Sequence, residues 1–84
     1  MGENELLIKV KDGLNIYDDS INSTLLIFIK EVKNHMLDGG IPRSFFDDDS
    51  CVGIVTIGVR DLYYNGSLSA YFDRRMFQLK YRGE

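Results

Sequence analysis

The segment CVGIVTIGVRDLYY, from Cys51 to Tyr64, decides the fold, because its first nine residues carry no charge. It is the most apolar part of an 84-residue chain that is 44% hydrophobic and 27% charged. This composition is typical of a folded protein, and the length suffices for one domain with a single modest core. We therefore expect residues 1–84 to form one domain that covers this segment.

Two local structures are open for the segment. Its many β-branched residues favour a strand, and Asn65-Gly66 is a hairpin signal if strands flank it. Against a hairpin, the alternation of apolar and polar residues fails at Ile54-Val55, and a strand of this length would be unusual. Acidic residues before the segment and glycine after it favour a helix over approximately 49–64, with a hairpin as the alternative. The helical stripe would consist of Cys51, Val55, Val59 (or Gly58) and Leu62.

Two glycines interrupt this expected central helix. Gly53 and Gly58 each cost about 1 kcal/mol of helix propensity relative to alanine. We expect both of them to face a crossing helix, where the missing side chain lets another backbone approach closely. This expectation makes the two glycines a direct test of how the core is packed.

Apolar residues at steps of three and four predict three further helices, over approximately 5–15, 19–37 and 68–81. Asp18-Asp19-Ser20 supplies capping oxygens before the second helix, and Gly39-Gly40 ends it. Ser67 or Ser69 can cap the last helix. The fold class is therefore all-α, a small bundle of about four helices. The expected core stripes are Leu7, Val10 and Leu14; Ile21, Leu25, Phe28, Ile29, Val32 and Met36; and Leu68, Phe72, Met76 and Leu79, with Ile16, Tyr17 and the Phe45-Phe46 pair also anchored to the core.

The charge is unevenly distributed along the chain. The net charge is −3, but residues 1–59 carry −5 and residues 60–84 carry +2. A surface polarised in this way suits head-to-tail association of identical copies. With a single cysteine, no signal-peptide pattern and no apolar run long enough to span a bilayer, we expect an intracellular protein without membrane association.

No residue pattern indicates catalysis or a bound cofactor. The acidic run Asp47-Asp48-Asp49 lacks the glycine and the glutamate that an EF-hand would need downstream, so helix capping or a solvated loop is the better interpretation. Cys51 and His35 are the only residues of their kinds, too few for a zinc site and without the orienting group that a thiol nucleophile needs. We expect a buried cysteine, a surface histidine and no enzymatic activity.

The last predicted helix mixes basic and aromatic residues. Arg74, Arg75 and Lys80 are interleaved with aromatic side chains, a mixture that binds phosphate backbones and stacks on bases. At helical spacing most of these aromatics belong to the core, so a solvated basic face or a protein interface is favoured. A small helix-turn-helix-like regulator that binds nucleic acid remains the alternative function.

The order of these features resembles the head-to-tail connector, or DNA-packaging adaptor, family of tailed bacteriophages and prophages. The resemblance covers most of the chain and consists of hydrophobic and turn patterns. It is carried by Leu7-x-x-Val10-Lys11-x-x-Leu14-x-Ile16, Tyr17-Asp18-Asp19-Ser20, Ile21-x-x-x-Leu25-x-x-x-Ile29-x-x-Val32 up to Gly39-Gly40, Asp61-Leu62-Tyr63-Tyr64-Asn65-Gly66, and Leu68-x-x-Tyr71-Phe72-x-x-Arg75-Met76-x-x-Leu79.

The resemblance implies a structural protein without turnover. Copies would pack side by side into a ring beneath the portal, in contact with portal and tail-completion proteins, and DNA would pass through the channel without sequence-specific binding. The protein would assemble in the cytoplasm of the bacterial host and remain in the virion. It implies no catalytic residue, cofactor or metal, and the glycines of the central helix depart from the family's usual pattern. Our candidate interface residues are Phe45, Phe46, Tyr64, Arg74, Arg75 and Phe77.

Overall fold

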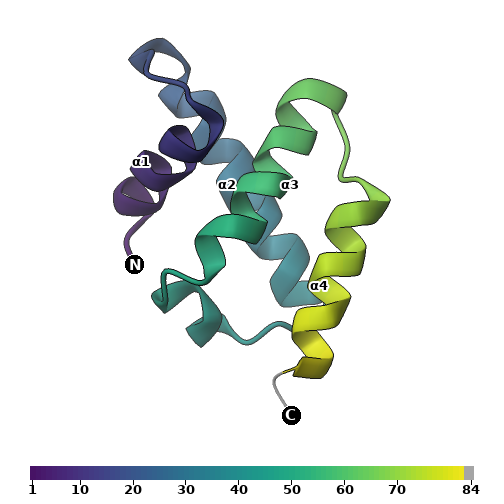
Figure 1. The fold of residues 1–84 in the computed structure, drawn as a ribbon. Coiled ribbons are helices and arrows are strands. Elements are labelled where there is room, and N and C mark those ends of the chain that lie inside the picture. Colours follow the sequence, from purple (N-terminus) through teal and green to yellow (C-terminus); the bar gives the residue numbers. More distant parts are fainter. Residues whose placement is uncertain (83–84) are drawn as a thin grey trace.

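The computed structural model describes residues 1–82, and this range contains four α-helices and two short 3-10 helices (Figure 1). No strand occurs within it, so the all-α prediction is confirmed and the hairpin alternative is wrong. Gly66 gives the reason, because it adopts a left-handed conformation (φ 78°) and its N–H donates to the Leu62 carbonyl, which ends a helix. The helices are α1 (Glu3–Leu14), η1 (Asp19–Ile21), α2 (Asn22–Asp38), η2 (Arg43–Asp47), α3 (Cys51–Asn65) and α4 (Ala70–Arg82).

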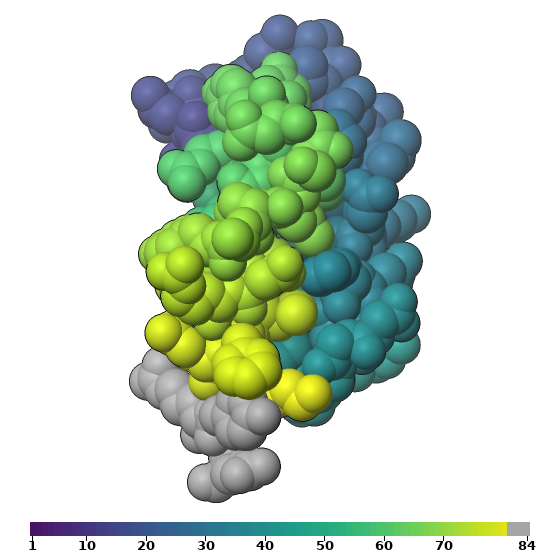
Figure 2. Space-filling view, turned by 90° about the vertical axis from the view of Figure 1, so that its right-hand side faces the viewer, coloured from purple at the N-terminus to yellow at the C-terminus, as the bar shows by residue number. Residues whose placement is uncertain are grey.

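Helix α3 is the centre of the bundle. It packs against α2, α1 and α4, and the last two lie on opposite sides of it (Figure 1). Figure 2, which views the molecule from the α4 side, shows α4 lying in front with α2 along one edge. The buried hydrophobic residues are Leu6, Leu7, Val10, Leu25, Ile29, Val32, Met36, Ile41, Phe46, Cys51, Ile54, Val55, Val59 and Phe72.

Gly58 is the point where α3 meets its neighbours most closely. A Cβ atom placed there would lie 2.8 Å from Phe72 Cε2 and 2.8 Å from Val32 Cγ2, closer than carbon atoms pack. Phe72 comes from α4 and Val32 from α2, so one missing side chain lets two helices approach α3. The expectation for Gly58 is confirmed.

Gly53 behaves differently, and the expectation for it is wrong. It is exposed, and a Cβ atom placed on it would meet nothing within 4 Å. Five residues advance an α-helix by about 140° beyond a full turn, so Gly53 and Gly58 cannot face the same neighbour. A different glycine supplies the second close approach, because a Cβ on Gly13 of α1 would lie 3.1 Å from Thr56 Cγ2 of α3.

Side-chain caps begin two of the helices, η1 and α4. The Asp18 carboxylate accepts hydrogen bonds from the backbone N–H and the hydroxyl of Ser20, and these bonds lower the pKa of Asp18. Ser69 caps α4, since its Oγ accepts from the Phe72 N–H at 3.1 Å. The same hydroxyl donates to the buried carboxylate of Asp61 at 2.6 Å, which joins the end of α3 to the start of α4.

One lysine of the first helix is buried, and the expectation for Tyr17 in the following turn is wrong. Lys11 does not point to solvent: it is buried, and its ammonium donates to Asp19 Oδ1 and Asn22 Oδ1 at 2.8 Å each. These contacts replace water around the charge and join α1 to the start of α2. Tyr17 does not enter the core but is 72% exposed, because Asn15 takes a left-handed conformation (φ 60°) and redirects the chain at the end of α1.

Candidate interaction surface

Helix α4 is held to the bundle by one stripe of apolar residues. Phe72 is fully buried against Gly58, and Leu68, Met76 and Leu79 are partly buried beside it. Their spacing of three and four residues places them on one side of the helix, as the sequence predicted. The opposite side of α4 is therefore left for solvent or a partner.

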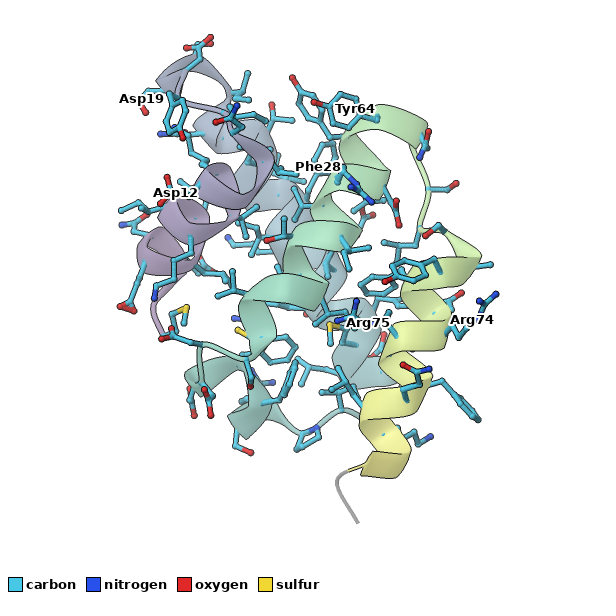
Figure 3. The ribbon with its side chains drawn as sticks, viewed as in Figure 1. Asp12, Asp19, Phe28, Tyr64, Arg74 and Arg75 are labelled. Atoms are coloured by element: carbon cyan, nitrogen blue, oxygen red, sulfur yellow. The ribbon has the colours of Figure 1, made fainter. Side chains whose placement is uncertain are left out.

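Arginine and aromatic residues occupy that outward side. Arg74 lies directly opposite the buried Phe72 stripe and points away from the bundle in Figure 3. Phe77, one helical turn further along, is 58% exposed, and Tyr71 is half-exposed. Exposed aromatic residues combined with arginine are typical of protein interfaces rather than of ordinary surface. The outward side of α4, composed of Tyr71, Arg74, Phe77 and Gln78, is called the α4 face below.

Arg75 borders the α4 face. Its guanidinium donates to the Tyr71 hydroxyl at 3.0 Å and lies 5.8 Å from the centre of the Tyr71 ring. This contact holds two long side chains in a defined arrangement, which lowers the conformational entropy that they would lose on binding. Arg75 is partly buried and extends toward the bundle in Figure 3, whereas Arg74 points away from it, so the structure places Arg74 and Phe77, but not Arg75, on the outward side of α4.

The other edge of α4 is attached to α2 by a polar contact. His35 Nε2 lies 3.2 Å from Asp73 Oδ1, and the His35 ring lies 5.8 Å from the ring of Phe72. The Met76 side chain covers the backbone at Gly39, where an added Cβ would meet it at 3.0 Å. His35 is a surface residue, as expected. Its contacts with Asp73 and Phe72 attach the end of α2 to α4.

Tyr64 lies apart from the α4 face. It is 64% exposed at the end of α3 and packs edge-on against Tyr63, with ring centres 5.0 Å apart. Tyr63 in turn contacts Phe28 of α2, and Figure 3 shows Phe28 and Tyr64 together at one end of the bundle. The structure therefore does not bring Tyr64 together with Arg74 and Phe77.

The Phe45-Phe46 pair anchors its loop to the core, as predicted, but Phe46 is not an interface residue. It is only 3% exposed, and Lys33 lies over its ring at 5.4 Å from the centre. Phe45 is half-buried with its ring edge against Phe46. Because the Phe46 side chain is buried within the monomer, almost none of its surface is available to a partner.

A second outward face, on α1, was not predicted from the sequence. Ile8 is 62% exposed, although it lies in a helix that buries Leu6, Leu7 and Val10. Glu5 and Asp12, one turn before and after it, are exposed on the same side of α1. The available signal was an isoleucine outside the apolar stripe and between two acids. These three residues are called the α1 face below.

The acidic run before α3 extends the negative charge near α1. Asp47, Asp48 and Asp49 are all exposed, and Asp49 accepts a hydrogen bond from Lys9 of α1 at 2.8 Å. This bond raises the pKa of Lys9, so the lysine stays charged and neutralises one carboxylate. The run sits where α3 begins, and the Asp48 carboxylate accepts from the Ser50 N–H.

No catalytic arrangement was found among the described residues. Cys51 is buried, and burial raises the pKa of its thiol, which is the opposite of what a nucleophile needs. Residues 1–82 hold no group of three His, Cys, Asp or Glu side chains placed to bind a metal ion. None of the helices within this range is long and apolar enough to cross a membrane.

Comparison of the chain with protein-family models, with curated proteins and with solved structures found no match. The class of protein is therefore argued from the residue pattern and from the surfaces described above.

Proposed function

We propose that the chain is a head-to-tail connector of a tailed bacteriophage or prophage, a structural protein whose copies form a ring between portal and tail. The observation that carries this proposal is the order of apolar stripes, turns and glycine stops over most of the chain. The four α-helices follow the same order, with η1 at the Tyr17–Ser20 turn and Gly66 closing α3. A small helical bundle suits a repeated subunit that is packed side by side.

The surface supports a binding role rather than catalysis. Large apolar residues are exposed on helices whose inner sides are already packed, among them Ile8 on α1 and Phe77 on α4. Apolar surface left in water is unfavourable in free energy, and burying it in an interface recovers that free energy. In the proposed ring the protein acts in the bacterial cytoplasm during assembly and afterwards in the virion, with portal and tail-completion proteins as partners.

The proposal is tested by native mass spectrometry of the purified chain, alone and mixed with the portal protein encoded nearest to its gene. We expect homo-oligomers that increase with concentration and a ring of this chain bound to the portal. A chain that stays monomeric at high concentration and does not bind the portal would refute the proposal. Electron microscopy of the mixture then reports whether the bound copies form a closed ring.

A helix-turn-helix regulator is the second candidate, because one observation favours it. Helices α3 and α4 are joined by only residues 66–69, with left-handed Gly66 in the turn, and α4 presents Arg74 and Gln78 outward. The net charge of −3 opposes it, since the whole molecule repels a phosphate backbone. Titration with duplex DNA over a range of salt concentrations decides the matter: phosphate contacts impose a steep salt dependence, and its absence excludes this function.

A further inference from the structure

We infer that adjacent copies of this chain meet with the α4 face of one copy against the α1 face of the next. The inference rests on the proposed ring and assigns its subunit contact to particular residues. The composition of the two faces, their charges and their positions on the bundle support it.

The two faces have matching compositions. On α4 the basic Arg74 is flanked by the aromatic side chains of Tyr71 and Phe77, and on α1 the apolar Ile8 is flanked by Glu5 and Asp12. All six are separated from the next by three or four residues on their own helix, so each set of three forms one stripe along a helix surface. A stripe with apolar residues and one sign of charge can pack against a stripe with apolar residues and the other sign.

Charged residues beside the two faces also favour a contact between the α1 face and the α4 face. Beside the α1 face lie the exposed carboxylates of Asp47, Asp48 and Asp49, of which Asp49 is bonded to Lys9. On α4, Asp73 lies 3.2 Å from His35 at the edge against α2, one turn before Phe77. The residues of the α4 face include Arg74 and no acid, and Asp73 beside them contacts His35, which favours encounter of this face with a negative surface.

Contact between two identical faces is disfavoured by charge repulsion. Two α4 faces in contact would bring Arg74 against Arg74, and two α1 faces would bring the carboxylates of Glu5 and Asp12 together. Like charges across an interface cost free energy, so a twofold dimer through either face is disfavoured. The favoured contact joins unlike faces, which makes the association heterologous.

The positions of the faces allow the contact to repeat. Helices α1 and α4 lie on opposite sides of α3, and Asp12 and Arg74 lie at opposite sides of the molecule in Figure 3. Because each copy carries both faces, occupying one face leaves the other available to the next copy. A heterologous contact of this kind builds a closed ring when the rotation between copies closes, and a filament when it does not.

The test is cross-linking between two single-cysteine additions, Ile8→Cys and Phe77→Cys, with a short bis-maleimide. Mixing the two variants should give a cross-linked dimer, whereas each variant alone should give none, and a chain carrying both changes should give a ladder of oligomers. The unchanged chain is the control for the buried Cys51. Cross-linking of either variant with itself as efficiently as in the mixture would overturn the inference, as would absence of the mixed product both alone and with the portal present.

Charge reversal tests the electrostatic part of the contact. Arg74→Glu should weaken self-association by about tenfold, as should Asp12→Arg, and combining the two reversals in one chain should recover most of the loss. Arg60→Glu and Glu31→Lys are matched controls, because both residues are exposed on other helices. Equal loss with the controls, or no recovery in the double variant, would refute the assigned pairing.

The two proposals fail in different ways. If rings form on the portal without the Ile8–Phe77 cross-link, the connector function stands and the assigned contact is wrong. If the cross-link forms but no ring binds the portal, the heterologous contact stands and the connector function is wrong.

Discussion

Replacing Gly58 with alanine tests the packing at the centre of the bundle. The added Cβ would lie 2.8 Å from Phe72 Cε2 and 2.8 and 2.9 Å from the two γ-carbons of Val32. Valine has a single preferred rotamer in a helix, and Phe72 is fully buried, so neither neighbour can move away freely. The backbone of α3 must shift away from α2 and α4 instead.

The magnitude follows from two opposing terms. Inserting a carbon into a well-packed core costs about 1–3 kcal/mol, and three contacts below 3.0 Å place Gly58→Ala at the upper end. Alanine recovers about 1 kcal/mol of helix propensity. The expected net loss is about 2 kcal/mol, a large share of the roughly 4–13 kcal/mol available to a domain of this size.

Gly53→Ala is the matched control on the same helix. Nothing lies within 4 Å of the position that its Cβ would take, so only the propensity gain remains. We expect about 0.5–1 kcal/mol of stabilisation, slightly reduced because Gly53 lies in the first turn of α3. The two substitutions are chemically identical and should have opposite signs.

Urea unfolding followed by far-ultraviolet circular dichroism measures both variants. Gly58→Ala should lower the midpoint and Gly53→Ala should raise it, with unchanged slopes because the fold is retained. By thermal unfolding, the loss at Gly58 corresponds to a decrease of roughly 8–16 °C. If Gly58→Ala is as stable as the unchanged chain, the close crossing of α2 and α4 at this residue is wrong.

The remaining predictions concern the cap of α4, a charge pair and the thiol. Ser69→Ala should cost about 1–2 kcal/mol in urea unfolding, because it removes the cap of α4 and a hydrogen bond to Asp61; Ser69→Thr, which keeps the hydroxyl, should lose much less. The hydrogen bond from Lys11 lowers the pKa of Asp19, so this carboxylate stabilises the fold above the ordinary carboxyl range and the contribution is lost as the pH falls through the lowered pKa. Asp19→Asn should therefore lower the urea midpoint at neutral pH and flatten its decline in acid, and an unchanged acid profile would contradict the pair. Cys51 should react with a thiol reagent only as fast as the core opens, so its labelling should accelerate with urea, whereas fast labelling of the folded chain would show that it is not buried.

The helices could be predicted because their signals are local. The steps of three and four residues in α2 report which side is buried, and the glycines and serines at the ends satisfy backbone groups within one turn. Helix α3 was ambiguous only because β-branched residues are common in it. The apolar stripe and the glycine at its end correctly predicted a helix, whereas the number of β-branched residues favoured a strand.

Most features that the sequence did not predict depend on which parts of the chain meet. Lys11 is buried because it donates hydrogen bonds to Asp19 of η1 and Asn22 of α2. No local sequence pattern predicts these contacts. Phe46 was expected both to anchor its loop to the core and to belong to an interface, and the structure buries it in the core. Gly53 is the exception, since the helical angle between it and Gly58 could have excluded a shared role from the sequence alone.

Only part of the candidate surface could be predicted from the sequence, because the helical period shows which residues point outward but not which helices lie together. Arg74 and Phe77 fall off the apolar stripe of α4, so their outward direction follows from the helical period. Tyr64 was grouped with them by composition, but it belongs to a separate cluster with Phe28 and Tyr63. Composition identifies residues suited to an interface, and only the packing of the helices decides which of them can share one.

The distribution of apolar surface connects the core to the proposed assembly. A bundle of this size has few layers, so each outer helix can bury one stripe and must present the other side outward. In α1 and α4 the outward sides retain Ile8 and Phe77, each of which is more than half exposed. In the proposed assembly, their positions beside opposite charges suit a subunit with two unlike neighbours.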